Sequence, residues 1–202
     1  MEHNTKEKIL DAALVNFAEN GYRGTNLREL AAGLGLSKSA LYKHYTSKED
    51  IWNAVLDRME AYYAARFGSP ENIPPVPKTC EELCVLTMQM LDFTMHDRRV
   101  VLTRQLLLTE QFRDERARRL ASLHFLTGTK DIFTKLFAAM MDHGVLKRDD
   151  AEMLAFTYTA PITTLLHLCD REPENEAAIR NKIEAFVRHF IGTYGIKKGE
   201  QQ

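Results

Sequence analysis

The chain has 202 residues, of which 45% are hydrophobic, and a formal net charge of −1. This composition excludes a globally disordered chain, and it lacks the overall basicity that would coat nucleic acid indiscriminately. No apolar run is long enough to cross a bilayer, there is no signal peptide, and the three cysteines cannot form a disulfide scaffold, so we expect a soluble protein in a reducing cytoplasm.

The chain begins with a predicted amphipathic helix from Thr5 to Glu19, and Gly21 follows its end. A short helix comes next. Asn26 can cap this second helix, and Glu29, three residues later, would close a capping box. Gly35 follows the last apolar position, where a helix that ends in the left-handed conformation favours glycine.

A third helix is predicted from Lys38 to Tyr45, with Ser37 as its cap and Leu41 on its buried face. Four side chains would face outward: Lys38, Ser39, Lys43 and His44. A turn this short makes the two helices cross steeply, which is the helix-turn-helix arrangement whose second helix enters a DNA major groove. An ordinary helical hairpin shares much of this pattern and remains the alternative.

Positive charge is concentrated in the same region. The stretch from Tyr22 to Lys48 contains five cationic residues and one acidic residue, so it carries a net charge of +4 and the rest of the chain carries −5. The cations are Arg23, Arg28, Lys38, Lys43 and Lys48. A local patch on a nearly neutral protein favours specific DNA binding, although a randomly basic helical face is the simpler alternative.

Helical patterns continue through the rest of the chain. A connecting helix runs from Ser47 toward Phe67, and four prolines between Gly68 and Lys78 mark a loop and the best domain boundary. Further helices are predicted at 79–96, 98–109, 112–143 (one long helix or two), 149–169 (capped by Asp149 with Glu152) and 173–194. No sustained period-two pattern predicts strands. We therefore expect an all-α fold with a three-helix DNA-binding domain (1–47), a connecting helix (48–67) and a helical effector-binding and dimerisation domain (68–202).

The run from Ala12 to Ile51 resembles the N-terminal DNA-binding domain of the tetracycline-repressor (TetR) family. Its most specific part is L-Y-x-H-Y-x2-K-E, from Leu41 to Glu49. Ser39 and Tyr45 depart from the family pattern, which favours glycine or proline and phenylalanine at these positions. The resemblance implies a homodimer built by the last two helices (about 151–169 and 177–193). It also implies a palindromic double-stranded operator, and an effector pocket in the C-terminal domain that releases the operator when occupied. Repression is the family's usual mode.

We predict that Lys38, Ser39, Lys43 and His44 approach base edges, with Ala40 among them on the same helix. The predicted phosphate contacts are Thr25, Asn26, Arg28, Tyr42 and Lys48; the roles of Thr25, Tyr42 and Lys48 come from the family resemblance. For an apolar or aromatic effector, the candidate contacts are Met88, Phe93, Phe112, Phe125, Phe133, Phe137 and Tyr158. For each of these side chains taken singly, ordinary core packing is the simpler explanation.

Other functions find less support in the sequence. There is no Ser-His-Asp set, phosphate loop or supported pair of catalytic carboxylates, so we do not expect an enzyme. The histidines follow no metal-ligand spacing, and no cofactor motif is present, so neither a metal nor a cofactor is predicted. Cys80 and Cys84 share a helical face, which leaves a redox or metal pair open beside a role as small helix residues. The main rival is a helical protein-interaction adaptor that does not bind DNA.

Overall fold

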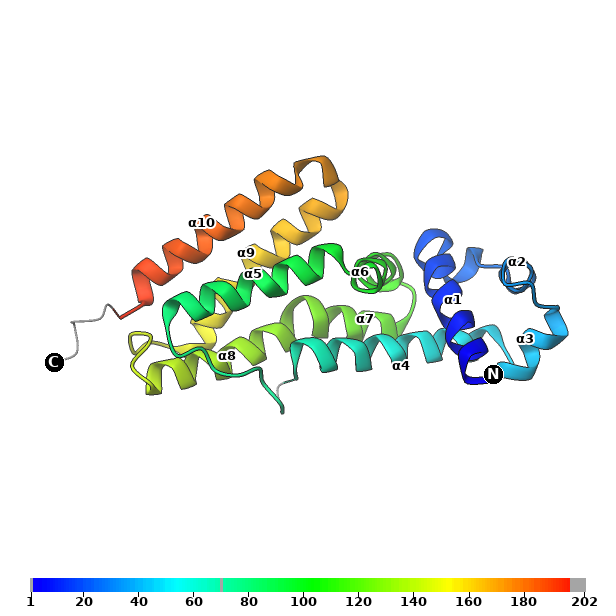
Figure 1. The fold of residues 1–202 in the computed structure, drawn as a ribbon, viewed down its shortest axis with the longest axis horizontal. Helices are drawn as coiled ribbons and strands as arrows, with labels where there is room; N and C mark the ends of the chain where they lie inside the picture. The colour runs from blue at the N-terminus through cyan, green and yellow to red at the C-terminus, as the bar shows by residue number, and fades with distance from the viewer. Residues whose placement is uncertain (1, 70, 197–202) are drawn as a thin grey trace. The chain divides into compact units, whose positions relative to one another are not determined.

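The structure is a computed structural model that describes residues 2–69 and 71–196. Over these ranges the chain is helical, as predicted (Figure 1), and β pairing is limited to two isolated bridges, Ser69 with Asn72 and Leu146 with Gly195. None of the helices in this part of the chain is long and apolar enough to cross a membrane.

The chain forms two compact units. Of the described residues, 2–65 and 97–121 belong to the first unit, and 66–96 and 122–196 belong to the second. The predicted division at 1–47, 48–67 and 68–202 follows sequence segments and stays a prediction. Residues 97–121 group with the N-terminal helices because α6 (Arg98–Glu110) packs along α1 (Glu2–Gly24), a long-range contact that no local pattern reveals.

The first unit contains two short helices near the N-terminus and the longer helices that surround them. Besides α1 and α6 it holds α2 (Leu27–Gly33), α3 (Lys38–His44), α4 (Lys48–Phe67) as far as Ala65, and α7 (Glu115–Ser122) up to Ala121. α1 bends at Gly21, whose φ of +69° suits glycine, close to the predicted end of the first helix. The buried ring of Phe17 meets Trp52 of α4 edge-on, with centroids 5.1 Å apart. This aromatic contact joins α1 to α4, while α2 packs on α1 and α3 packs on α2.

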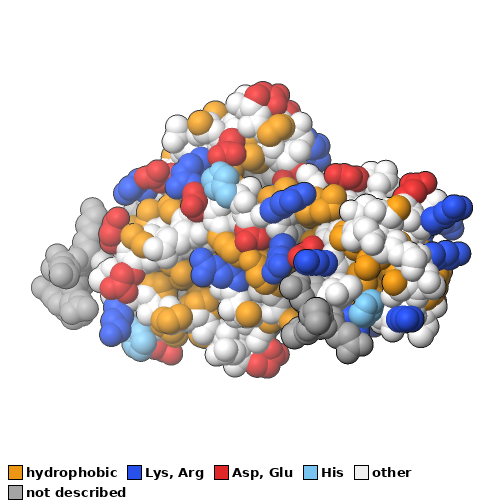
Figure 2. Space-filling view, turned by 45° about the vertical axis from the view of Figure 1, so that its right-hand side comes forward, with side chains coloured by type: hydrophobic (Ala, Val, Ile, Leu, Met, Phe, Trp, Pro, Cys, Tyr) orange, Lys and Arg blue, Asp and Glu red, His pale blue; other side chains and the backbone are white. Residues whose placement is uncertain are grey.

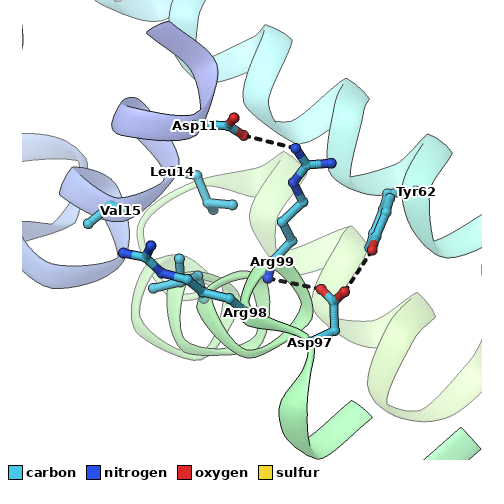
Figure 3. Close-up of a pocket in the computed structure, with 8 residues that line it drawn as sticks. Asp11, Leu14, Val15, Tyr62, Asp97, Arg98 and Arg99 are labelled. Atoms are coloured by element: carbon cyan, nitrogen blue, oxygen red, sulfur yellow. Dashed lines mark hydrogen bonds and ion pairs between the residues drawn. The ribbon is translucent and has the colours of Figure 1, made fainter. Parts of the chain in front are cut away.

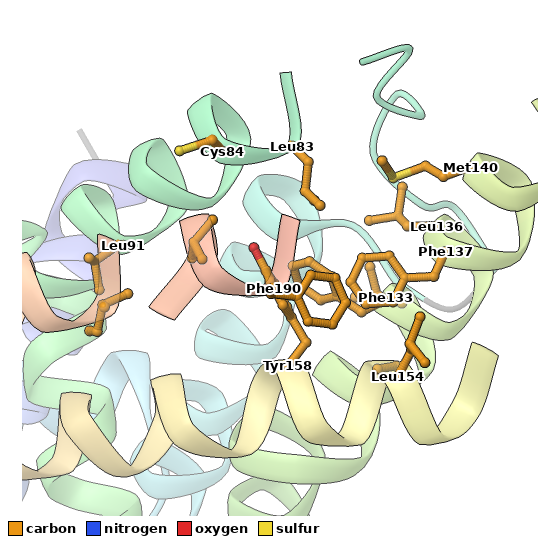
Figure 4. Packing of buried hydrophobic residues seen from close by; sticks show 14 of the residues in the cluster. Leu83, Cys84, Leu91, Phe133, Leu136, Phe137, Met140, Leu154, Tyr158 and Phe190 are labelled. Carbon is orange, nitrogen blue, oxygen red and sulfur yellow. The ribbon is translucent and has the colours of Figure 1, made fainter. Parts of the chain in front are cut away.

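The second unit has its core among four helices: α5 (Cys80–His96), α8 (Gly128–Asp142), α9 (Ala151–Arg171) and α10 (Glu176–Tyr194). Figure 4 shows the rings of Phe133, Phe137, Tyr158 and Phe190 in contact at its centre. The hydroxyl of Tyr158 lies 2.6 Å from Thr87 Oγ1, so the one polar atom of this fully buried ring has a partner.

Two helices, α7 and α8, occupy the span 112–143, which agrees with one of the two predicted alternatives, and a π-helical segment (Leu123–Thr127) separates them. Two local expectations farther along the chain need correction. Asp150 rather than Asp149 caps α9, since Asp150 directly precedes the first helical residue and its Oδ1 accepts from the Glu152 and Met153 N–H groups at 2.9 and 3.0 Å. A 3₁₀ turn, Pro173–Asn175, precedes α10.

Candidate nucleic-acid interface

The turn between α2 and α3 is specified by its own residues. The side chain of Asn26 accepts a hydrogen bond from the Arg28 N–H at 2.9 Å, and Ser37 Oγ accepts one from the Ala40 N–H at 3.1 Å, as predicted for two capped helices. Gly35 has φ of +68°, the left-handed conformation expected at this position. Glu29 accepts from the Asn26 side-chain amide at 3.1 Å, so the predicted capping box closes through the side chain instead of the backbone N–H.

α3 presents one apolar anchor and several solvent-facing groups. Leu41 is fully buried, whereas Lys38, Ser39, Tyr42 and Lys43 are exposed, and Ala40 and His44 are partly buried. The Lys38 ammonium lies 5.6 Å from the centroid of the Tyr42 ring. Asn26 and Arg28 are exposed at the start of α2, and basic side chains appear at this end of the first unit in Figure 2. The predicted base-reading residues thus share one accessible helix.

Thr25 differs from the other predicted DNA contacts because it is only 4% exposed. Its hydroxyl donates to the Gly21 carbonyl oxygen at 2.9 Å, and its N–H donates to the same atom at 3.2 Å. The side chain therefore closes the α1–α2 turn from within. Its phosphate contact stays a prediction, and the structure gives the residue this additional structural role.

Lys48 also has internal partners. Its ammonium donates to the carbonyl oxygens of Thr25 (2.5 Å) and Arg23 (3.4 Å), and it lies 4.8 Å from the centroid of the Tyr22 ring. Burial lowers the pKa of Lys48, since desolvation disfavours the charged form. At the start of α4 this lysine ties the reading helices to the connecting helix, so any phosphate contact would use an ammonium already anchored there.

The seven predicted effector contacts are not all in one place. Phe133, Phe137 and Tyr158 form one aromatic cluster, with Tyr158 5.2 Å from each of the other two centroids, and all three are buried in the core of the second unit. Met88 packs against the same core.

The other three lie elsewhere. Phe125 meets the His167 ring edge-on at 4.9 Å, and Phe93 packs on Phe67 at 5.4 Å. Phe112 must be separated from the set: it is 87% exposed, and it belongs to the first unit because it follows α6 directly.

A hollow of about 410 Å³ lies within the first unit, between α1, α4 and α6 (Figure 3). None of the predicted effector contacts lines it. Four of its lining residues are paired with one another: the Tyr62 hydroxyl donates to Asp97 at 2.8 Å, Asp97 also accepts from the Arg99 N–H at 2.9 Å, and the Arg99 guanidinium lies 3.4 Å from Asp11. The hollow is therefore a junction of three helices that hydrogen bonds and an ion pair hold together.

Among the described side chains, neither the cysteines nor the histidines form a recognisable site. Burial raises the pKa of both the Cys80 and Cys84 thiols, which disfavours the thiolate needed for redox or metal chemistry. Within the part of the chain that the structure describes, no group of three or more His, Cys, Asp or Glu side chains could hold a metal ion.

Sequence reasoning missed one residue beside the interface. Glu110, at the end of α6, is 2% exposed, and its carboxylate accepts a hydrogen bond from the Tyr22 N–H at 3.1 Å. No local pattern could have revealed this contact, because the two residues are 88 positions apart.

Comparison with known proteins bears on this interface directly. Residues 9–55 match the family model described as bacterial regulatory proteins, tetR family. IcaR of Staphylococcus epidermidis, a negative transcriptional regulator of the icaADBC biofilm operon, is 36% identical over 58 residues, which are 29% of this chain and 31% of IcaR. The chain therefore matches less than a third of the length of this curated relative.

Solved structures extend the likeness to nearly the whole chain. SmeT, the repressor of the Stenotrophomonas maltophilia multidrug efflux pump SmeDEF, gives a TM-score of 0.68 at 20% identity, over 96% of this chain and 91% of SmeT. A SmeT–triclosan complex gives 0.74 at 22% identity, over 97% and 93%. At these identities the likeness concerns the fold. Residues 9–55 therefore match the tetR-family model, and nearly the whole chain shares its helical fold with these solved structures.

Proposed function

We propose that the protein is a DNA-binding transcriptional regulator that acts as a repressor on a palindromic operator and is released by a small effector. One observation carries this proposal: α3 is anchored by the buried Leu41 and leaves Lys38, Ser39 and Lys43 exposed beside a short, capped turn. A helix held in this way can enter a major groove without unfolding its supports. Repression is favoured because IcaR and SmeT are described as a negative regulator and a repressor.

The proposed contacts divide into two groups. Lys38, Ser39, Lys43 and His44 approach base edges, where lysine favours the acceptor atoms of guanine, and Ala40 lets the α3 backbone come close. Asn26, Arg28, Tyr42, Lys48 and Thr25 hold the phosphate backbone and set the register. The exposure of Asn26, Arg28 and Tyr42 supports this division, whereas Thr25 and Lys48 would act from the turn that they also stabilise.

The proposed regulator is a homodimer. One seven-residue helix reads only a few base pairs, and a twofold axis lets two such helices read a palindrome. The proposed interface consists of α9 and α10, at about 151–169 and 177–193. Met153 and Phe156 of α9 support it, since these large apolar side chains are 57% and 46% exposed in the single chain.

The proposed effector is apolar or aromatic, and the second unit would bind it. The aromatic cluster of Phe133, Phe137 and Tyr158, with Met88 beside it, supports this choice because such a core can open to accept a ring. SmeT has a similar fold, and one of its solved structures is a complex with triclosan, an aromatic compound. Met88, Phe93 and Phe125 remain proposed contacts. The protein would act in the cytoplasm, where bacterial DNA lies, and it would catalyse no reaction.

A gel-shift experiment tests the proposal. The full-length protein is titrated into the duplex immediately upstream of its own gene, with a scrambled duplex of equal length as the control. We expect a discrete complex on the upstream duplex, and this complex should dissociate as the salt concentration is raised. Equal binding to both duplexes, or none, contradicts the proposal and favours the adaptor. Triclosan and a hydrophilic compound are then compared by thermal shift; stabilisation by hydrophilic compounds alone contradicts the apolar effector.

A further inference from the structure

Glu110 is an ionisable side chain that is almost completely buried, and its burial needs an explanation. It ends α6 with 2% of its surface exposed. Burying a carboxylate is costly unless hydrogen bonds or opposite charges compensate it. One compensating partner is a backbone N–H of α1, 88 positions away in the sequence, and another is an arginine three residues along the chain.

The first partner is the backbone of the α1 bend. Glu110 Oε1 accepts from the Tyr22 N–H at 3.1 Å, directly after Gly21. Gly21 has φ of +69°, and a Cβ added there would lie 2.7 Å from Glu110 Oε1. The carboxylate therefore fits directly against a bend whose backbone angle favours glycine.

The other partners are cationic. The Arg113 guanidinium lies 3.7 Å from Glu110 Oε1. Lys48, the first residue of α4, contacts the turn between α1 and α2. Its ammonium donates hydrogen bonds to the Thr25 and Arg23 carbonyl oxygens and lies over the Tyr22 ring. The charge of Glu110 acts on the pKa of Lys48 in the direction opposite to burial. The α1–α2 turn is thus bonded by an anionic group from α6 and by a cationic group from α4.

We propose that Glu110 is a positioning residue for DNA binding, which fixes the α1–α2 turn and through it the placement of α2 and α3. This inference rests on the proposed function, because it concerns how the reading helices are presented. Without the carboxylate, the Tyr22 N–H loses its acceptor and Lys48 loses a nearby opposite charge. The turn is then free to shift, and α3 shifts with it.

Four variants of the full chain separate positioning from simple stability. Glu110→Ala removes the acceptor and the charge, whereas Glu110→Gln keeps an acceptor oxygen of similar reach. Glu115→Ala removes an equal charge from an exposed position five residues away. Leu106→Ala weakens the core of α6 at a fully buried position one helical turn before Glu110, without removing a charge.

The readout is the dissociation constant for a duplex that the wild type selects from a random pool, and for a scrambled duplex, at a temperature where circular dichroism shows every variant folded. For Glu110→Ala we expect at least about tenfold weaker binding to the selected duplex, the effect of losing one charge-assisted hydrogen bond. The loss on the scrambled duplex should be smaller. Glu110→Gln should retain most of the affinity, and both control variants should stay within about twofold of wild type.

Two results would overturn the inference alone: Glu110→Ala binding the selected duplex as tightly as Glu115→Ala, or Leu106→Ala losing as much affinity while folded. A wild type that selects no duplex overturns the proposed function and this inference together. If Glu110→Ala does not fold, Glu110→Asp replaces it, because the shorter side chain keeps the charge but retreats from the Tyr22 N–H. Selected-duplex binding equal to wild type by that variant would likewise overturn the inference.

Discussion

Replacing Lys43 and Lys48 by alanine tests how the proposed interface divides its work. Lys43 is exposed on α3, so Lys43→Ala should change the free energy of unfolding by no more than about 0.5 kcal/mol. If its ammonium contacts a base edge, its loss should weaken binding to the selected operator by about 1–3 kcal/mol, or roughly 5- to 150-fold. The affinity for scrambled DNA should change little, so specificity falls.

Lys48→Ala should behave differently because this side chain has two tasks. Loss of a phosphate contact should weaken selected and scrambled duplexes alike and reduce the slope of log affinity against log salt by about 0.9. Loss of the bonds to the Thr25 and Arg23 carbonyls should also lower the free energy of unfolding by about 1–2 kcal/mol, a range reduced for partial exposure.

Fluorescence anisotropy with both duplexes, from about 50 to 200 mM salt, measures these effects, and urea unfolding measures stability. Lys78→Ala is the matched control, since it removes the same charge from an exposed position in the second unit, outside α9 and α10. Equal losses on both duplexes from Lys43→Ala and Lys48→Ala would refute the division into base-reading and phosphate-holding groups.

Three further predictions concern stability. Gly35→Ala should lower the free energy of unfolding by about 1–2 kcal/mol, measured in urea, because φ is +68° there and the added Cβ meets no atom within 4 Å; a much larger loss would mean a steric clash. Tyr158→Phe should cost only about 1 kcal/mol, since Thr87 keeps its bond to the Leu83 carbonyl, whereas Phe137→Ala should cost about 3–5 kcal/mol. Burial lowers the pKa of His124 to about 4, so below pH ~6.5 the unfolded chain binds more protons than the folded chain. The free energy of unfolding should therefore fall by about 3 kcal/mol as the pH is lowered from ~6.5 to 4. Thermal melts of the His124→Gln variant should lack this pH dependence.

The helix-turn-helix could be read from the sequence because its determinants are local. Asn26, Ser37 and Gly35 act within three or four residues of their own positions, as caps and as a left-handed turn, and the structure places them as expected. Where two neighbouring residues compete for one local role, the pattern is less decisive. Asp149 and Asp150 both suit a cap, and only the backbone of α9 selects Asp150.

The predicted effector contacts show where such reasoning fails. An apolar residue on a helix can face a core, a ligand or solvent, and composition does not distinguish these environments. Phe133 and Phe137 are in the core, whereas Phe112 is almost fully exposed at the end of α6. The difference follows from which helices pack around each position.

By itself, the sequence determined most of the helices, the caps and turn around α2 and α3, and the basic face of α3, because each depends on residues a few positions apart. Tertiary structure alone decided what holds that face in place: residues 97–121 join the first unit, Glu110 bonds Tyr22 across 88 positions, and Lys48 bonds the turn that it follows. The physical reason is that a buried hydrogen bond or ion pair depends on proximity in space, and chain folding brings together groups whose separation in sequence carries no periodic signal.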